Sequence, residues 1–285
     1  MPPDELAAAF EAHRPYLRRL AYSTLGSVAE ADDVVQDAWV RLQRADASEI
    51  RDLRAWLTTV VGRLALDSLG AARRRREQYV GPWLPEPLVE DDPADRVTLD
   101  ESVTTALLVV LEQLSPAERT AFVLHDVFGL TFDAVGEVVG RAPSAVRQLA
   151  SRARRHVEEG TPRFPASRDE HERLVTAFAA AARAGDVEAL TRVLDPDVTF
   201  RADGGGKVIA ARHPIGGAAR VARVLTKLAG KTWRGARVVL VNDMPGLLVD
   251  DGAPVPSVYS LTVDGDRIVA VDVLRNPDKL QHLSS

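Results

Sequence analysis

The chain has 285 residues, which is enough for two or three domains that each bury a core. It contains no cysteine, which excludes disulfides and thiolate metal sites, and no metal or other cofactor is expected. It has no apolar run of transmembrane length and no signal-peptide pattern, so we expect a soluble, cytoplasmic protein without a membrane partner. Residues 1–159 hold 19 basic against 26 acidic residues, and residues 160–285 hold 17 against 15, so nucleic-acid binding would depend on local basic clusters.

Two helices are predicted near the N-terminus. From Asp4 to Tyr22, apolar residues recur at helical spacing. A second pattern over residues 28–44 places apolar side chains on one face and Asp33, Gln36 and Asp37 on the opposite face. On spacing alone, the better interpretation of these three residues is a solvated acidic face.

A third helix is predicted over residues 51–76, and it is strongly basic. It carries seven Arg against two Asp, and Arg73, Arg74, Arg75 and Arg76 are consecutive. Such a run is either a solvated helix end or a patch that contacts phosphates.

Residues 77–101 predict a linker. They contain four prolines, and eight acidic residues are opposed by Arg96 alone, so a long helix is excluded. The sequence WLPEP lies within this segment at residues 83–87. Its tryptophan is expected to need an apolar pocket.

Two short helices joined by a tight break are predicted between Leu114 and Glu159. The first ends at Gly140, and Pro143 suits the first position of the second. The second helix has one apolar face, and its opposite face carries hydrogen-bonding groups: Ser144, Arg147, Gln148, Ser151 and Arg155. This pattern is typical of a helix-turn-helix with a major-groove reading helix, and an amphipathic hairpin packed in a bundle is the alternative.

These patterns resemble a known family. Residues 114–157 resemble region 4 of the sigma-70 family, in particular of the extracytoplasmic-function (ECF) sigma factors, and residues 28–76 resemble their region 2. The resemblance implies that region 4 reads the −35 promoter element with Ser144, Arg147, Gln148, Ser151, Arg152 and Arg155. It implies contacts near the −10 element from Arg63, Arg73, Arg74, Arg75 and Arg76. It also implies that Asp33, Gln36 and Asp37 bind the clamp helices of the largest subunit of bacterial RNA polymerase, and that the flap of the core enzyme is a further contact.

The pattern changes after Gly160. Helices are predicted over 171–183, 186–194 and 216–228, and strands over 198–201, 207–212, 236–241, 246–249, 257–263 and 268–274. These elements favour an α+β domain with a curved sheet. Residues 168–280 resemble the SnoaL-like branch of the NTF2-like superfamily, whose members form a cone.

Three short motifs join the two halves, and together they resemble ECF sigma factors with a SnoaL-like C-terminal extension. The first is WLPEP, made of Trp83, Leu84, Pro85, Glu86 and Pro87. The second is DGGGK, made of Asp203, Gly204, Gly205, Gly206 and Lys207. The third is NPDKL, made of Asn276, Pro277, Asp278, Lys279 and Leu280. Turn chemistry explains the last two about as well as a binding role does, with a glycine hairpin in one and a helix cap in the other.

We therefore predict a multidomain chain: all-α region 2 (1–78), an acidic linker (79–103), helix-turn-helix region 4 (104–160) and a SnoaL-like domain (168–285). The predicted function is an alternative sigma factor that brings core RNA polymerase to promoter DNA and is regulated in cis by its C-terminal domain. A one-component ligand-binding DNA regulator and an enzyme fused to a DNA-binding module are the alternatives. Asp203, His213 and Asp243 are catalytic candidates by residue type alone, so we predict no catalysis, and a small-molecule ligand in this domain stays open.

Overall fold

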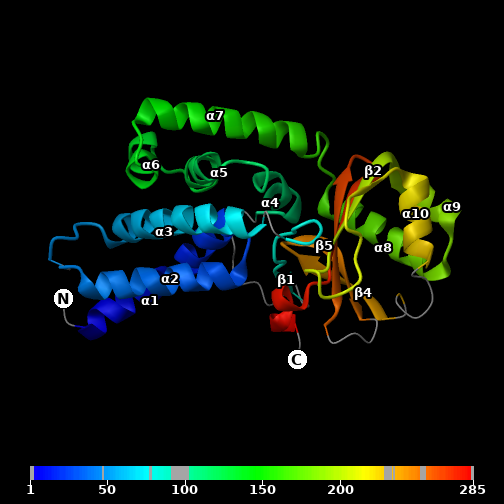
Figure 1. The fold of residues 1–285 in the computed structure, drawn as a ribbon, viewed down its shortest axis with the longest axis horizontal. Helices are drawn as coiled ribbons and strands as arrows, with labels where there is room; N and C mark the ends of the chain where they lie inside the picture. Colours follow the sequence, from blue (N-terminus) through cyan, green and yellow to red (C-terminus); the bar gives the residue numbers. More distant parts are fainter. Residues whose placement is uncertain are drawn as a thin grey trace. The chain divides into compact units, whose positions relative to one another are not determined.

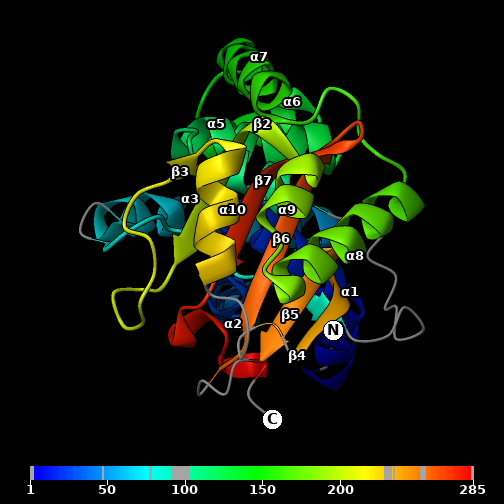
Figure 2. The same cartoon turned by 90° about the vertical axis from the view of Figure 1, so that its right-hand side faces the viewer.

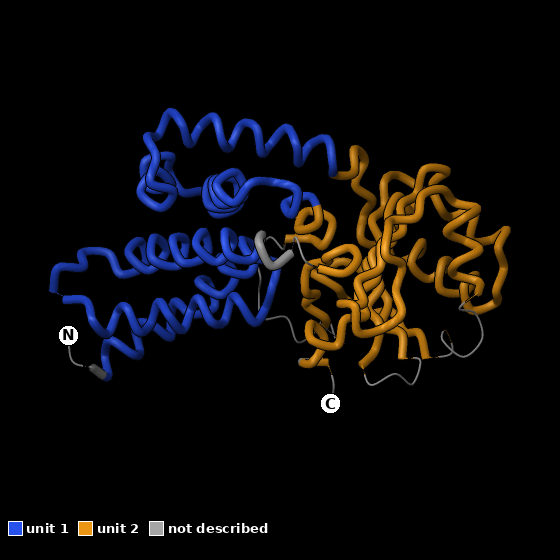
Figure 3. The backbone as a smooth tube through the Cα atoms, viewed as in Figure 1, with its two compact units in different colours: residues 1–77, 110–160 blue, residues 78–109, 161–285 orange. Residues whose placement is uncertain are grey.

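The computed structural model describes residues 3–46, 48–76, 79–90, 103–227, 233, 235–250 and 255–283. The chain divides into two compact units, which Figure 3 colours separately. The first comprises residues 1–77 and 110–160, and the second comprises residues 78–109 and 161–285. The segment between the two helical regions therefore belongs to the same unit as the C-terminal part. Among the described helices, none combines the length and apolar character needed to cross a membrane.

Three long helices form the first half of the first unit. They are α1 (Pro3–Leu25), α2 (Val28–Arg44) and α3 (Leu53–Arg76), and Figure 1 shows them packed side by side. Their buried faces form a leucine-rich core that includes Leu17, Leu20, Leu42 and Leu57. Ser27 caps α2 because its hydroxyl accepts a hydrogen bond from the backbone N–H of Glu30.

The other half of the first unit contains shorter helices. They are α5 (Pro116–Phe122), the π-helix η2 (Val123–Val127), α6 (Phe132–Val139) and α7 (Pro143–Gly160), and α4 (Thr105–Leu111) spans the boundary between the two units. Gly140 ends α6 in the left-handed conformation, with φ of 69°, and Pro143 begins α7, as the sequence predicts.

Gly136 is required by the turn of this helix-turn-helix. A Cβ atom at this position would lie 2.7 Å from the carbonyl oxygen of Arg141. The close approach therefore involves the backbone of the connection between α6 and α7.

A seven-stranded sheet forms the centre of the second unit. Its strands are β1 (Val89–Glu90), β2 (Leu194–Asp203), β3 (Ile215–Gly216), β4 (Gly235–Val241), β5 (Met244–Asp250), β6 (Ser257–Asp264) and β7 (Arg267–Leu274). The order is β1-β4-β5-β6-β7-β2-β3, and β2 runs parallel to β7 while the other pairs are antiparallel. The predicted meander of four C-terminal strands is confirmed.

Three helices cover one face of this sheet, as Figure 2 shows: α8 (Arg168–Ala184), α9 (Val187–Val193) and α10 (Ala218–Lys227). The core between them is aromatic at its centre. The Trp233 ring lies 5.0 Å from the Tyr259 ring and 5.9 Å from the Phe178 ring, centroid to centroid. All three side chains are buried, so they fill the interior of the domain.

Three features of the second unit differ from the prediction, and one of them is strand β3, which was not predicted. The predicted strand over residues 207–212 is wrong, because the backbone N–H groups of Lys207 and Val208 both donate to the carbonyl oxygen of Gly204 and form a tight turn. Strand β1 was not predicted. It comes from the linker and pairs with β4, with Val89 opposite Val241.

Two short 3₁₀-helices end the described chain, η3 (Pro277–Lys279) and η4 (Gln281–Leu283). The side chain of Asn276 caps η3 by accepting a hydrogen bond from the backbone N–H of Asp278, and Pro277 occupies the first turn. This is the cap that the sequence predicts for the NPDKL motif.

Candidate functional site

The polar face of α7 is exposed. Its apolar face is buried through Val146, Leu149, Ala150 and Ala153. On the opposite side, the following side chains are open to solvent: Ser144, Arg147, Gln148, Ser151, Arg152 and Arg155. These residues can donate hydrogen bonds to a partner, and they form the surface that a reading helix needs.

The arginines of α7 differ in how they are held. Arg152 donates from Nε to the carboxylate of Glu118 at 2.8 Å, and Arg154 is paired with Asp126. The guanidinium of Arg147 lies over the ring of Phe132 instead, with Cζ 5.1 Å from the centroid. Its N–H edge is therefore not the part that contacts Phe132.

The acidic face of α2 is also exposed. Asp33, Gln36 and Asp37 are open to solvent, and the apolar face opposite them is buried. Trp39 is half-buried, and its ring centroid lies 5.0 Å from that of Phe10. The face is thus available to a partner without any change in the packing of α2.

Helix α3 packs against α6 within the first unit. The guanidinium of Arg63 donates from Nε and Nη2 to the carbonyl oxygen of Glu137, at 3.2 and 2.9 Å. A Cβ at Gly62 would lie 3.0 Å from the Val138 side chain, so the two helices approach closely. The predicted −10 contact Arg63 is therefore engaged with α6. The side chains of residues 73–76 lie outside the described part of the structure.

The three motifs of the linker and the C-terminal domain meet at one buried ion pair. The ammonium of Lys279 donates to Asp203 Oδ2 at 2.8 Å and to the carbonyl oxygen of Leu84 at 2.6 Å. It also lies 3.8 Å from the ring centroid of Trp83 and 5.2 Å from that of Tyr79. Asp203 has no exposed surface and Lys279 is 8% exposed. We call the cluster of Tyr79, Trp83, Leu84, Asp203, Gly205, Asn276 and Lys279 the linker clamp.

Every oxygen of the Asp203 carboxylate is used within the clamp. Oδ1 accepts from the Tyr79 hydroxyl at 2.5 Å and from the Gly205 N–H at 3.0 Å. Oδ2 accepts from the Leu84 N–H at 2.9 Å, in addition to Lys279. Burial, together with the neighbouring Asp203 carboxylate, raises the pKa of Tyr79, so its hydroxyl stays protonated and donates. This set of bonds offsets the cost of burying the charge.

Asn276 and Gly205 complete the clamp. Asn276 Nδ2 donates to the Tyr79 hydroxyl at 2.7 Å. A Cβ at Gly205 would lie 2.5 Å from the Asn276 side chain, and Gly205 has φ of 62°, so both space and conformation favour glycine. Lys207 and Asp278 form a separate, exposed ion pair at 2.6 Å beside the clamp.

The WLPEP motif is buried to different depths. Trp83 is half-buried, and the more deeply buried residues are Leu84, Pro85, Glu86 and Pro87. Leu84 belongs to a small apolar cluster with Leu274 and Leu280. Of the two predicted anchor residues, Trp83 and Leu84, Leu84 is the more deeply buried and lies in the apolar cluster.

A second anchor holds the linker at the β4–β5 hairpin, and no sequence pattern predicts it. Asn242 is buried, with φ of 50°, and its backbone N–H donates to the carbonyl oxygen of Leu88 at 2.8 Å. Its side-chain oxygen accepts from the Leu88 N–H at 3.3 Å and from the Thr105 hydroxyl at 3.2 Å. The linker is therefore held on both sides of residues 91–102. Leu88 and strand β1 hold it before this segment, and Thr105 holds it after the segment.

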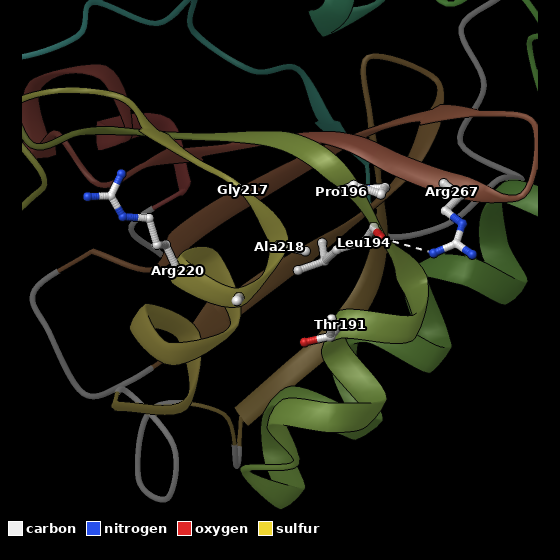
Figure 4. A pocket seen from close by; sticks show the side chains of 8 residues that line it. Thr191, Leu194, Pro196, Gly217, Ala218, Arg220 and Arg267 are labelled. Carbon is white, nitrogen blue, oxygen red and sulfur yellow. Dashed lines mark hydrogen bonds between the residues drawn. The ribbon is translucent and has the colours of Figure 1, made fainter.

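A shallow cavity of about 520 Å³ lies near the surface of the C-terminal domain and is shown in Figure 4. Its lining residues are Thr191, Leu194, Pro196, Gly217, Ala218, Ala219, Arg220 and Arg267. Arg267 donates to the carbonyl oxygen of Leu194 at 3.3 Å, and Arg220 extends away from Thr191 and Leu194. The three catalytic candidates lie elsewhere: Asp203 in the linker clamp, His213 on an exposed loop and Asp243 in the β4–β5 turn.

The comparisons with known proteins agree with this arrangement. Residues 9–75 match the family of sigma-70 region 2, and residues 104–157 match that of sigma-70 region 4. The chain is 41% identical to the ECF RNA polymerase sigma factor SigJ of Mycobacterium tuberculosis, over 95% of this chain and 91% of SigJ. It is 37% identical to the probable ECF RNA polymerase sigma factor SigI of the same organism, over 98% of this chain and 96% of SigI.

The fold has a solved counterpart over nearly its whole length. A crystal structure of the M. tuberculosis extracytoplasmic function sigma factor SigJ matches with a TM-score of 0.79 and 38% identity, covering 96% of this chain and 97% of that one. Helical sigma regions 2 and 4, followed by an α+β domain, define a promoter-recognition factor with an added C-terminal domain. The chain belongs to the ECF RNA polymerase sigma factors of the sigma-70 family. Its function is to direct core polymerase to promoter DNA, and the one-component regulator is not favoured.

Proposed function

We propose that the C-terminal domain controls this sigma factor in cis by holding the linker between regions 2 and 4. The observation that carries the proposal is the linker clamp, in which a buried Lys279–Asp203 pair binds Tyr79, Trp83 and Leu84. A linker attached to a folded domain cannot extend freely. The clamp therefore limits how far region 2 can separate from region 4.

The packing inside the first unit shows why a limit on the separation of regions 2 and 4 affects promoter recognition. Regions 2 and 4 share one compact unit, and Arg63 of α3 is engaged by the Glu137 carbonyl of α6. Reading the −10 and −35 elements together requires a defined separation of the two regions. We infer that the form described here is closed and that core polymerase and promoter DNA favour an open one.

The residue roles follow from the exposed faces. We infer that the polar face of α7 reads the −35 element and that the basic side of α3 contacts the −10 element, including Arg63 after it leaves Glu137. We infer that Asp33, Gln36 and Asp37 bind the clamp helices of the largest polymerase subunit, with region 4 on the flap. Because it acts on core polymerase, we infer that the protein works in the cytoplasm.

The proposal assigns no chemistry to the C-terminal domain. Its interior is filled by Phe178, Trp233 and Tyr259, and the Asp203 carboxylate is used by four hydrogen bonds in the clamp. The domain acts by binding its own linker, so control requires neither catalysis nor a small-molecule ligand.

The test is promoter-specific transcription in vitro with purified core polymerase. Tyr79→Phe combined with Trp83→Ala removes clamp contacts from the linker side and leaves the core of the C-terminal domain unchanged. We expect transcription to rise at limiting core polymerase, because the closed form loses about 1–3 kcal/mol of stabilisation.

Val80→Ala is the matched control, since Val80 lies in the same segment and is exposed. It is expected to transcribe like the parent chain. A double variant that folds normally and transcribes no more than the parent would contradict control through the clamp.

A further inference from the structure

Arg147 is part of an ordered stack of three side chains. Its guanidinium carbon lies 5.1 Å from the centroid of the half-buried Phe132 ring. The Phe132 ring in turn stacks on the imidazole of His125, with centroids 3.8 Å apart and an interplanar angle of 29°. The three residues come from α7, α6 and η2, so the stack ties the reading helix to the two elements before it.

Local structure fixes the two rings below Arg147. His125 lies in the π-helix, and Gly129, with φ of 70°, reverses the chain so that the Leu130 carbonyl oxygen lies 2.7 Å from His125 Nδ1. A carbonyl only accepts hydrogen bonds, so Nδ1 carries the proton and the imidazole orientation is set. Phe132 is the first residue of α6, whose start is capped by the Thr131 hydroxyl accepting from the Ala134 N–H.

Within the part of the chain that the structure describes, this stack leaves the hydrogen-bonding edge of Arg147 free. A guanidinium lying over an aromatic ring uses its face, and its N–H groups remain available to a base edge. Arg152 and Arg154 differ, because each directs N–H groups to a carboxylate, of Glu118 and Asp126 respectively. Among these three arginines of α7, Arg147 is the one that is held by an aromatic ring and keeps its N–H groups available to a partner.

We propose that Phe132 is a positioning residue for Arg147 in promoter recognition, and that it sets base preference without contacting DNA. The proposal rests on the role of α7 as the −35 reading helix given above. Binding a long, exposed side chain costs rotamer entropy, and a side chain held by stacking before it meets DNA loses less. His125 contributes by fixing the ring on which Arg147 rests.

The test uses holoenzyme made from the full chain and core polymerase. Each variant selects promoters from a library randomised over the −35 element, and base preference is measured position by position. Arg147→Ala is expected to lose roughly tenfold or more of the preference at one position. Phe132→Leu, which keeps an apolar side chain without the ring, is expected to lose about two- to fivefold at that same position.

Two further variants separate positioning from packing. Phe132→Tyr keeps the ring and is expected to retain the preference. Val139→Ala trims another half-buried residue of α6 and is expected to change thermal stability without changing which base is preferred. In the double variant Phe132→Leu with Arg147→Ala, the loss is expected to equal that of Arg147→Ala alone, because the ring acts only through the arginine.

Three results would overturn the proposal. In the first, the Phe132→Leu holoenzyme keeps the base preference of the parent. In the second, the Phe132→Leu holoenzyme loses base preference equally at all positions, or at a position that Arg147→Ala does not affect. The third is an unchanged preference in Arg147→Ala, which would also remove Arg147 from the reading face of α7. In the first two results, Arg147→Ala still shifts the preference, so the failure of Phe132 as a positioning residue is distinguishable from the failure of the reading helix.

Discussion

The polar face of α7 and the linker clamp use hydrogen-bonding side chains in opposite ways. On α7, Arg147 and Gln148 are exposed and keep their hydration until a partner arrives. In the clamp, Asp203 and Lys279 are buried, and their hydrogen bonds are made within the second unit. The first arrangement presents groups to another molecule, and the second holds two distant parts of one chain together.

The difference has energetic consequences that can be measured. Exposed substitutions away from special contacts change the free energy of unfolding by less than about 0.5 kcal/mol, whereas breaking a buried ion pair costs about 3–5 kcal/mol. Variants of the exposed faces should therefore change binding and leave stability intact. Variants of the clamp should change stability of the second unit and the linker together.

The largest effect is expected at the acidic face of α2. Reversing the charge at both Asp33 and Asp37 should abolish assembly with core polymerase, because like charges would then oppose the basic surface that we expect on the partner. Both side chains are exposed, so circular dichroism should be unchanged. The measurement is co-elution of the variant with purified core polymerase.

The matched control makes the same charge change on the C-terminal domain, with Glu172→Lys and Glu188→Lys, which are also exposed. This control should still assemble. Unchanged core affinity in the α2 variant would remove the acidic face from the interface.

The next largest effect is expected in the linker clamp. Lys279→Met leaves the Asp203 carboxylate buried without its cation and should lower the free energy of unfolding of the second unit by about 3–5 kcal/mol. Urea denaturation measures it, followed by the fluorescence of Trp83 and Trp233 in a chain whose other tryptophans, Trp39 and Trp56, are replaced by Phe. Lys207→Met breaks only the exposed pair with Asp278 and should cost less than about 1 kcal/mol. Equal costs for the two lysines would show that burial does not distinguish them.

A smaller effect, on binding alone, is expected on α7. Gln148→Ala should lose about 1–3 kcal/mol of discrimination at the −35 element if its amide reaches a base edge. The unfolding midpoint should stay within experimental error of the parent. Competition between specific and scrambled promoters measures the loss, and equal losses on both would rule out base reading by Gln148.

The smallest effect is a pH dependence of the second unit. Burial lowers the pKa of His171 below its ordinary value of 6.5, so the folded domain keeps the ring neutral. As pH falls through 6.5, the unfolded chain takes up a proton that the folded domain does not. Stability should therefore decrease by up to about 1.4 kcal/mol per pH unit until the lowered pKa is reached.

Thermal melting between pH 7.5 and pH 5 tests this prediction, with His171→Phe as the variant that lacks the titrating ring. The parent curve should fall relative to that of His171→Phe across this range. Parallel curves would show that His171 is not held neutral.

The sequence predicts the exposed faces better than the clamp, for a physical reason. Helical periodicity puts Asp33 and Arg147 on solvent faces without any knowledge of distant residues. The fold class and the four C-terminal strands follow from the same local patterns. The predicted strand over residues 207–212 fails because alternation in a short segment does not exclude a turn closed on the Gly204 carbonyl.

The clamp could be located from the sequence but its chemistry could not. The motif around Trp83 marks one side and those around Asp203 and Lys279 mark the other, yet no pattern pairs residues this far apart. Tyr79 and Asn242 lie outside the motifs, and their roles depend on contacts across more than 100 positions in the chain.

The most direct test of cis control is the separation of regions 2 and 4 measured by fluorescence energy transfer during titration with core polymerase. Because the chain has no cysteine, Gln43→Cys in α2 and Glu158→Cys in α7 provide two specific labelling sites, and both positions are exposed. With Tyr79→Phe and Trp83→Ala, the regions should separate at a lower polymerase concentration, by about tenfold for each 1.4 kcal/mol of clamp stabilisation removed. Coincident titration curves for the parent and the clamp variant would contradict the claim that the C-terminal domain, by holding the linker, keeps regions 2 and 4 in the closed form.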